Sequence, residues 1–506
     1  MLLDHPSLEP FEPIIAELFD IAFGTAFRGL ATTGVRPGDE WHTEAALVYR
    51  AACLPGFKKA QDALGTRVIE LEIKICELKN EETKRRENKD ALGAEQSRTV
   101  RKILQNRQLV LRRLVDGMLW LLFLPDKWIL RRLRLEGGIR RVNVDQIREL
   151  LNAIVDQHAK DEDTVWIICD LSTLAQLGDV IFAQWKPGRD RMKLVVGELK
   201  VGQKNILLHE RLHDPGTADL ATRIAGISHE LGPKAAKQAI RMARQELRLK
   251  NFEHVVRTDA GINPVSGQKF RMTKSASVSK DYRDQIWGLI SRAKLDGSSA
   301  VTLDGCLHLL AIQTQPNQTN EGLRVAHRLF HMRTGDFCRL PGPEEARKQE
   351  MAEIVKGPMA INLLDFNMRT SIAMPPLLWY PRDAMLDVLM GRVKIFAQFD
   401  HERFFEMALK SGLKVGFIRG KEAARIKSAK LSGPLPEYRD LRFIRAENSH
   451  GKVSFFGARF FTKVYTELVR PTDLFEMTRD LVEEAGRPGA AAYFRPVGKQ
   501  QRGAKS

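Results

Sequence analysis

The stretch from Leu177 to Gly202 reads LGDVIFAQWKPGRDRMKLVVGELKVG and sets the first expectation about the fold. Two apolar runs flank the turn-forming residues 187–190, where Pro fixes one backbone angle and Gly accepts the opposite hand. The stretch therefore predicts a β-hairpin. If the chain turns at these four residues, paired positions sum to 377, so that Phe182 lies opposite Val195.

The same register predicts that three polar side chains meet on one face of the hairpin. Asp179 should lie opposite Glu198, and such cross-strand partners have β-carbons about 5 Å apart. Glu198 and Lys200 share a face because strand side chains alternate with a period of two. Two facing carboxylates repel each other, and a divalent cation such as Mg²⁺ (or Mn²⁺) removes that repulsion. We predict that Asp179 and Glu198 bind the metal, and that Lys200 assists the water that attacks a phosphodiester.

The hairpin resembles the signature of the restriction-endonuclease-like, or PD-(D/E)xK, nuclease superfamily. In that superfamily an Asp precedes a (Glu/Asp)-x-Lys triplet on the next strand. Asp179 matches the Asp, Glu198 and Lys200 match the triplet, and Gly178 stands where the pattern has Pro. The resemblance covers residues 116–313. It implies a Mg²⁺-dependent nuclease that hydrolyses DNA, in restriction, repair or defence against foreign DNA.

The resemblance also implies supporting residues outside the hairpin. The helix expected at Pro233–Lys250 carries Gln238 and Arg241, where related enzymes often place supporting polar side chains, and we include Gln238 among the catalytic candidates. Some members use a further acid upstream of the strands. Asp116 and Glu149 are the two candidates for that acid.

The Glu-x-Lys triplet alone carries little information. It occurs four more times between Glu72 and Lys89, in a charged segment that is typical of a solvated helix. Only Glu198 and Lys200 lie in an apolar strand that follows a turn. The alternative interpretations are an exposed edge hairpin with an ordinary ion pair, and a nuclease fold that has lost its chemistry.

A rival motif follows the hairpin directly. Residues 209–213 read HERLH, an HExxH spacing that on a helix places two imidazoles on one face to bind zinc, with the Glu as general base. Pro215 disfavours helical angles at Asp214, which places the second His at a fraying end. No third ligand stands out, although His229 and Glu230 are near in sequence. We interpret the segment as a polar turn and keep a zinc hydrolase as a third hypothesis.

The charge balance predicts a polyanionic partner. The net charge is +17, and the sequence pI is about 9.6. Lysine and arginine are concentrated in residues 98–141, 233–283 and 410–463, whereas residues 1–50 are acidic. Cations near phosphates release condensed counterions, so that we expect DNA as the partner. A non-catalytic DNA-binding scaffold is therefore the alternative function.

The element pattern predicts a mixed α/β fold. We expect a helical N-terminal region with a coiled-coil arm (1–115), a central mixed β-sheet nuclease core flanked by helices (116–315), an α/β C-terminal domain (316–495) and a disordered tail (496–506). Strands are expected at Val165–Cys169, Val180–Trp185, Leu194–Val201, Phe252–Arg257 and Leu307–Gln313.

The coiled-coil arm is predicted from an apolar seam. Val68, Leu71, Ile75 and Leu78 follow the three-four spacing of such a seam. The charged stretch that follows is either one solvated helix or a helical hairpin that turns near Gly93. The arm is a candidate surface for protein partners.

The cysteines and the apolar runs help to predict where in the cell the protein is located. The five cysteines are widely spaced without a CxxC pair, which argues against a disulfide framework and a structural zinc site. We see no export signal, and the apolar run Met118–Leu124 is far below the roughly 20 residues that span a bilayer. We therefore expect a cytoplasmic protein without a membrane segment.

Overall fold

The computed structural model shows a mixed α/β fold that divides into two compact units, Met1–Thr258 and Asp259–Ser506. The described residues are 5, 7–24, 44–123, 130, 133, 141–161, 163–184, 193–198, 203–214, 219–258, 260–262, 269–271, 281–314, 361–378, 381–418, 443–451 and 453–485. Helices hold most of these residues, and the strands form several small antiparallel sheets.

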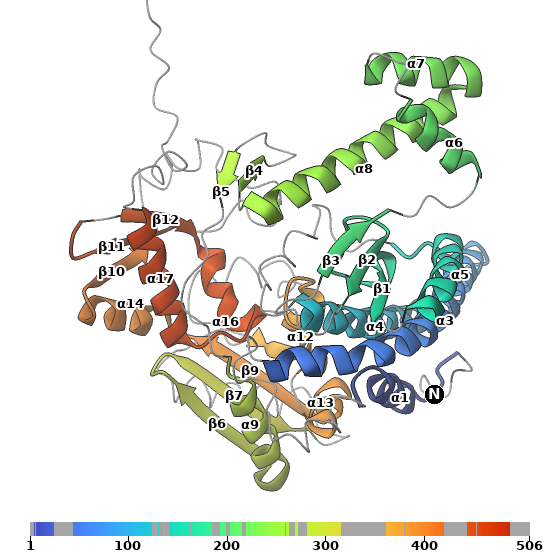
Figure 1. Cartoon of the computed structure of the whole chain (residues 1–506). Coiled ribbons are helices and arrows are strands. Elements are labelled where there is room, and N and C mark those ends of the chain that lie inside the picture. The colour runs from blue at the N-terminus through green and yellow to red at the C-terminus, as the bar shows by residue number, and fades with distance from the viewer. Residues whose placement is uncertain are drawn as a thin grey trace, which may run out of the picture. The chain divides into compact units, whose positions relative to one another are not determined.

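A long helical hairpin dominates the first unit. Helix α3 (Glu44–Glu87) and helix α4 (Ala91–Phe123) lie side by side in Figure 1, preceded by α1 (Glu12–Phe19) and the π-helical turn η1 (Asp20–Gly24). The chain reverses at residues 88–90. The hairpin interpretation of the charged stretch is therefore confirmed, with its turn just before the expected position.

The apolar seam is buried inside this hairpin. Its α3 side chains are at most 8% exposed, and the matching side chains of α4 are also buried. These residues are Val68, Leu71, Ile75, Leu78, Val100, Leu104, Leu111 and Leu114. Across the two helices, Arg101 Nη2 donates to Glu82 Oε2 at 2.8 Å. The three-four apolar spacing thus holds two helices of the same chain together.

A three-stranded antiparallel sheet follows the hairpin. It has the order β1-β2-β3, with β1 at Thr164–Ile168, β2 at Val180–Gln184 and β3 at Lys193–Gly197, and a short 3-10 turn η3 (Cys169–Leu171) follows β1. The three predicted strands here are confirmed, although β3 ends earlier than expected. Helix α5 (Val144–Lys160) packs against β1.

The outer edge of β1 is paired by a side chain of α3. Gln61 is fully buried, and its Nε2 donates to the carbonyl of Trp166 at 2.7 Å. Its Oε1 accepts from the amide of Ile168 at 2.8 Å. A strand at the edge of a sheet has backbone groups without a partner strand. The side-chain amide of Gln61 provides hydrogen bonds to two of them and thereby attaches the sheet to the helical hairpin.

Three helices complete the first unit: α6 (Gln203–Leu212), α7 (Leu220–Leu231) and α8 (Pro233–Thr258). They surround a small core of Leu208, Leu212, Ile227, Ala235, Ala239 and Met242. Two predictions are wrong here. The HERLH segment is not a polar turn, because its first four residues form the end of α6 and His213 follows directly, and Phe252–Arg257 lies in α8 and not in a strand. After Pro233 no Gly or Pro stops that helix, and its continuation overrides the β propensity of the last residues.

The main sheet of the second unit has the order β6-β7-β9-β8 and is antiparallel. Its strands are β6 (Ser298–Leu303), β7 (Leu307–Gln313), β9 (Val393–Phe399) and β8 (Ile361–Asn362), with α9 (Arg283–Asp296) against β6 and β7. The predicted strand Leu307–Gln313 is confirmed. Its partners are β6 and β9 of the second unit. It therefore does not join the sheet β1–β3 of the first unit.

A second small sheet and several short elements complete this unit. The sheet has the order β10-β11-β12, packed on α14 and α17. The elements are β4 (Ala260–Ile262), β5 (Lys269–Arg271), α12 (Leu363–Arg369), η4 (Pro376–Leu378), α13 (Arg382–Leu389), α14 (His401–Lys410), β10 (Leu413–Phe417), β11 (Phe443–Asn448), β12 (Val453–Gly457), η6 (Ala458–Thr462), α16 (Lys463–Thr466) and α17 (Pro471–Ala485).

The cysteines of the described residues form no disulfide bond. They are Cys53, Cys76, Cys169 and Cys306, whereas Cys338 lies outside those residues. Among the same residues, no helix combines the length and the apolar character needed to cross a bilayer. The predicted tail, residues 496–506, also lies outside the described residues.

Candidate functional site

The hairpin that carries the candidate acids has the predicted register. Every observed pair of β2 with β3 sums to 377, and the ladder ends with Val180 opposite Gly197. Asp179 and Glu198 directly follow this last pair, one on each strand, at the same end of the hairpin. The predicted turn lies in residues 185–192, outside the described residues.

Gly178 explains why the chain has no Pro before the candidate Asp. Its φ is +74°, in the left-handed region that proline cannot enter and that other L residues disfavour. A Cβ here would lie 2.7 Å from the carbonyl oxygen of Gly197. The amide of Asp179 donates to that same oxygen at 2.9 Å. Glycine at position 178 therefore allows β2 and β3 to stay close together at Asp179, just beyond the last pair of the ladder.

The Asp179 side chain is half-buried and contacts a helix. Gln146 Nε2 on α5 lies 3.3 Å from Asp179 Oδ1 and donates to it. The backbone of Asp179 is also held, because its carbonyl accepts from the amide of Cys169 at 2.8 Å. Sequence reasoning missed Gln146. Its position in the first turn of a capped helix was the available signal, since Asn143 Oδ1 accepts from its amide.

The structure gives less information on the other predicted site residues, Glu198, Lys200 and Gln238. Glu198 is half-buried. Lys200 lies outside the described residues. Gln238 is on α8, where its Nε2 lies 3.5 Å from Asn205 Oδ1 on α6. The contact of Gln238 therefore lies within the helical group α6–α8 and not at the end of the hairpin.

The two candidate upstream acids have different environments. Asp116 is fully buried and accepts hydrogen bonds from Arg113 Nη1 at 2.7 Å and from the amide of Thr173 at 2.8 Å. It ties α4 to the loop between β1 and β2, which is a structural role. Glu149 is exposed on α5, one turn after Gln146, and stays the candidate for an upstream acid.

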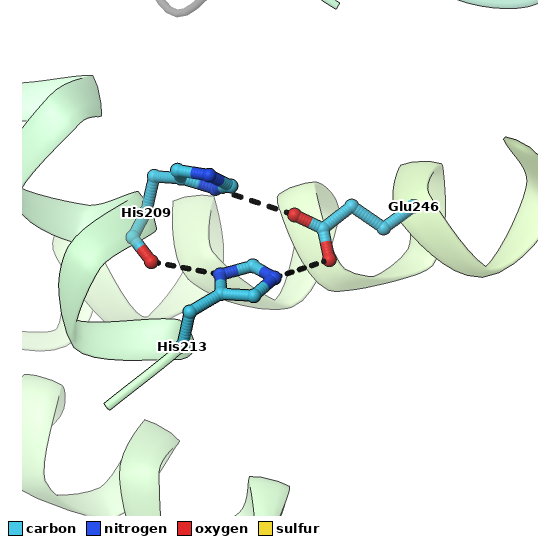
Figure 2. A group of neighbouring side chains, drawn as sticks. All are labelled: His209, His213 and Glu246. Atoms are coloured by element: carbon cyan, nitrogen blue, oxygen red, sulfur yellow. Dashed lines mark hydrogen bonds and ion pairs between the residues drawn. The ribbon is translucent and has the colours of Figure 1, made fainter. Parts of the chain in front are cut away.

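The HERLH segment forms a cluster with a residue that sequence reasoning did not identify. Figure 2 shows His209 and His213, at the end of α6, pointing toward Glu246 of α8. His209 Nδ1 lies 3.3 Å from Glu246 Oε1, and His213 Nε2 lies 3.0 Å from Glu246 Oε2. The three ligand atoms all lie within 4.8 Å of one another.

The sequence carries one weak signal for Glu246. It is the only acid in residues 233–250, a stretch that otherwise carries six cations. That signal does not relate Glu246 to the two histidines, which lie more than 30 residues earlier. The structure brings a third possible ligand, Glu246, to the two histidines, in place of His229 or Glu230, which are nearer in sequence. As expected from Pro215, α6 ends at Leu212, just before the second His, although the amide of His213 still donates to the carbonyl of His209 at 3.1 Å.

A row of cations follows the length of α8. Its members recur every three or four residues, so that they share one helix face. They are Lys234, Lys237, Arg241, Arg244 and Arg248, and all five are exposed. None of them pairs with a carboxylate among the described residues. The row extends over about 21 Å, from 14 residues at about 1.5 Å each.

No known protein family, curated protein or solved structure matches this chain. Its function is therefore inferred from the chemistry of its own residues. Two groups of side chains in the first unit provide that chemistry: the acids at the end of the β2–β3 hairpin and the histidine–glutamate cluster between α6 and α8.

Proposed function

We propose that the chain is a metal-dependent nuclease that hydrolyses DNA phosphodiester bonds. Asp179 and Glu198 are the proposed metal ligands, and Lys200 is the proposed partner of the attacking water. The register of β2 and β3 carries the proposal, because it leaves both acids directly beyond one ladder pair. The spacing of these residues is that of the PD-(D/E)xK pattern.

The donor set fits Mg²⁺ or Mn²⁺. Both cations prefer hard oxygen ligands, typically one or two carboxylates completed by water and phosphate. The cation, when bound, supplies a Lewis acid for the phosphoryl oxygen and lowers the pKa of a bound water. The residues of the chain provide the rest. Gln146 orients the Asp179 carboxylate, and Lys200 would stabilise charge that develops on the phosphate.

The cation row of α8 supports DNA as the substrate. Duplex DNA carries one negative charge for about every 1.7 Å of its axis, so that a row of about 21 Å can meet several phosphates. The exposed side chains from Lys234 to Arg248 are available for those contacts. Gln238 and Arg241 on the same helix would then act on the bound DNA and not on the metal.

The proposed nuclease core is the sheet β1–β3 with the helices α3 and α5 that contact β1. The apolar seam of the predicted arm is buried between α3 and α4. A protein partner would therefore have to bind the exposed, charged faces of these two helices. By its resemblance to the PD-(D/E)xK pattern, the proposed activity would serve restriction, repair or defence against foreign DNA.

The test is cleavage of supercoiled plasmid, linear duplex and single-stranded DNA by the purified full-length chain. We expect cleavage with Mg²⁺ or Mn²⁺ and none with EDTA. Asp179→Asn, Glu198→Gln and Lys200→Ala should each reduce the rate at least about 100-fold, as expected for residues that act on the transition state.

The matched control is Asp163→Asn. Asp163 is an exposed acid at the opposite end of the sheet, next to the start of β1. The Asp163→Asn variant should cleave DNA at the wild-type rate. Cleavage by Asp179→Asn at the wild-type rate would contradict the proposal, and so would cleavage that persists in EDTA. DNA binding without any cleavage would instead favour the non-catalytic scaffold.

A further inference from the structure

We propose that His209, His213 and Glu246 form a zinc site that fastens α6 to α8. Two imidazoles and one carboxylate are a ligand set that zinc accepts, with water in the fourth position. Magnesium prefers oxygen ligands alone, so that this cluster and the acids of the hairpin would select different metals. The site is separate from the proposed nuclease and does not depend on it.

Two distances between the ligand atoms are close to those around a zinc ion. Zinc bonds of about 2.0–2.2 Å at tetrahedral angles separate neighbouring ligand atoms by about 3.3–3.5 Å. Glu246 Oε1 lies 3.3 Å from His209 Nδ1, and Glu246 Oε2 lies 3.0 Å from His213 Nε2. Because one ligand atom from each side chain lies within 4.8 Å of the others, rotation of the side chains would bring all three around one ion.

The hydrogen bond of His213 fixes its ring in the state that binds metal. Its Nδ1 lies 2.9 Å from the carbonyl oxygen of His209 (Figure 2). A carbonyl oxygen only accepts, so that Nδ1 carries a proton and the neutral ring presents a lone pair at Nε2. A backbone carbonyl that orients a ligating imidazole in this way is the usual outer-shell partner in metal sites.

That lone pair faces a carboxylate oxygen. Nε2 of His213 and Oε2 of Glu246 are 3.0 Å apart, and two electron-rich atoms at this distance repel each other unless a cation lies between them. On the other ring, His209 Nδ1 and Glu246 Oε1 are buried atoms without a hydrogen-bond partner in the described part of the chain. Either zinc or a proton on each imidazole resolves both contacts.

A bound ion would cross-link two helices that share only a small core. The helical group α6–α8 has a core of only six buried residues, four of them Leu, Ile or Met. Small cores of this kind are commonly supplemented by a metal, because metal binding contributes directly to folding free energy. The ligands come from two helices far apart in sequence. The side chains of His209 and His213 are 43% and 45% exposed, so that zinc can enter from solvent.

The test uses the full-length chain after removal of metal with EDTA. Titration with Zn²⁺ in a calorimeter should show a site absent from His213→Gln and Glu246→Gln. Changes to outer-shell partners weaken metal binding roughly 10–100-fold, so that loss of a ligand should weaken it at least about 100-fold. Magnesium should not compete. Cobalt substitution should give the visible absorption of a four- or five-coordinate site in the wild-type chain.

His229→Gln is the matched control, because His229 is exposed on α7 of the same helical group. It should bind zinc like the wild-type chain. Zinc affinities of His213→Gln or Glu246→Gln within about threefold of wild type would overturn the site and leave a protonated His–Glu pair. Hydrogen exchange tests the fastening role, because zinc should slow exchange in α6 and α8. Zinc binding without that protection would overturn the role.

Discussion

Replacement of the buried acid Asp116 by Ala should strongly destabilise the first unit. The carboxylate accepts hydrogen bonds from Arg113, Ser172, Thr173 and Leu174, and it is completely buried. Arg113 is also completely buried. Burial lowers the pKa of its guanidinium, and the charge of Asp116 opposes that effect. Removal of Asp116 would take away the carboxylate that opposes the desolvation of the Arg113 guanidinium.

The expected cost follows from this geometry. Removing one partner of a buried ion pair costs roughly 3–5 kcal/mol, because the remaining charge keeps its desolvation penalty. For a unit of this size each kcal/mol shifts Tm by about 2–4 °C. We therefore expect Asp116→Ala to lower the Tm of the first unit by roughly 6–20 °C, measured by calorimetry or near-UV circular dichroism.

The double variant Arg113→Met/Asp116→Ala is the control. It removes the buried guanidinium together with the carboxylate, so that it should recover a large part of the loss. A shift below about 2 °C for Asp116→Ala would refute the reasoning. A double variant less stable than the single variant would also refute it, since the lost contacts of Arg113 would then outweigh the cost of burying its charge.

Three further predictions concern the hairpin, acid stability and DNA binding. Gly178→Ala should destabilise by roughly 1–3 kcal/mol in urea unfolding, because its φ is positive and a Cβ would meet Gly197 O, whereas Gly226→Ala on α7, where a Cβ meets nothing within 4 Å, should not. Burial, with Lys58 nearby, lowers the pKa of His158 from 6.5 to about 4. The unfolded chain then takes up the proton first, so that the free energy of unfolding should fall as pH drops from 6.5 to 4, and less so in His158→Gln. Unchanged acid sensitivity in that variant would contradict the assignment. Arg241→Gln/Arg244→Gln should reduce the slope of log K against log salt for duplex DNA by about 1.8, at about 0.9 per phosphate contact. Lys250→Gln, outside the row, should leave that slope unchanged.

The hairpin was predictable because its information is local. Alternating apolar residues and a Pro-Gly turn specify two strands, and a turn of known position fixes the pairing of each residue. The register with sum 377 is therefore confirmed. The helical hairpin α3–α4 was predictable for a similar reason, since a three-four apolar spacing buries one face of each helix.

The side-chain partners could not be predicted in this way. Gln146 is 33 residues from Asp179, and Glu246 is 33 residues from His213, so that no periodicity of one element relates them. The buried role of Asp116 depends equally on a loop more than 50 residues later.

The sequence by itself determined the register of the hairpin, the apolar seam of the long helices and the surplus of positive charge. Periodicity and turn chemistry act over a few residues, and these features need nothing else. Only the tertiary structure decided that HERLH lies at the end of a helix and has a carboxylate partner, that Asp116 is structural, and that Leu307–Gln313 joins the sheet of the second unit. Those outcomes depend on which distant elements pack together, and packing is settled by the shape and burial of the whole unit.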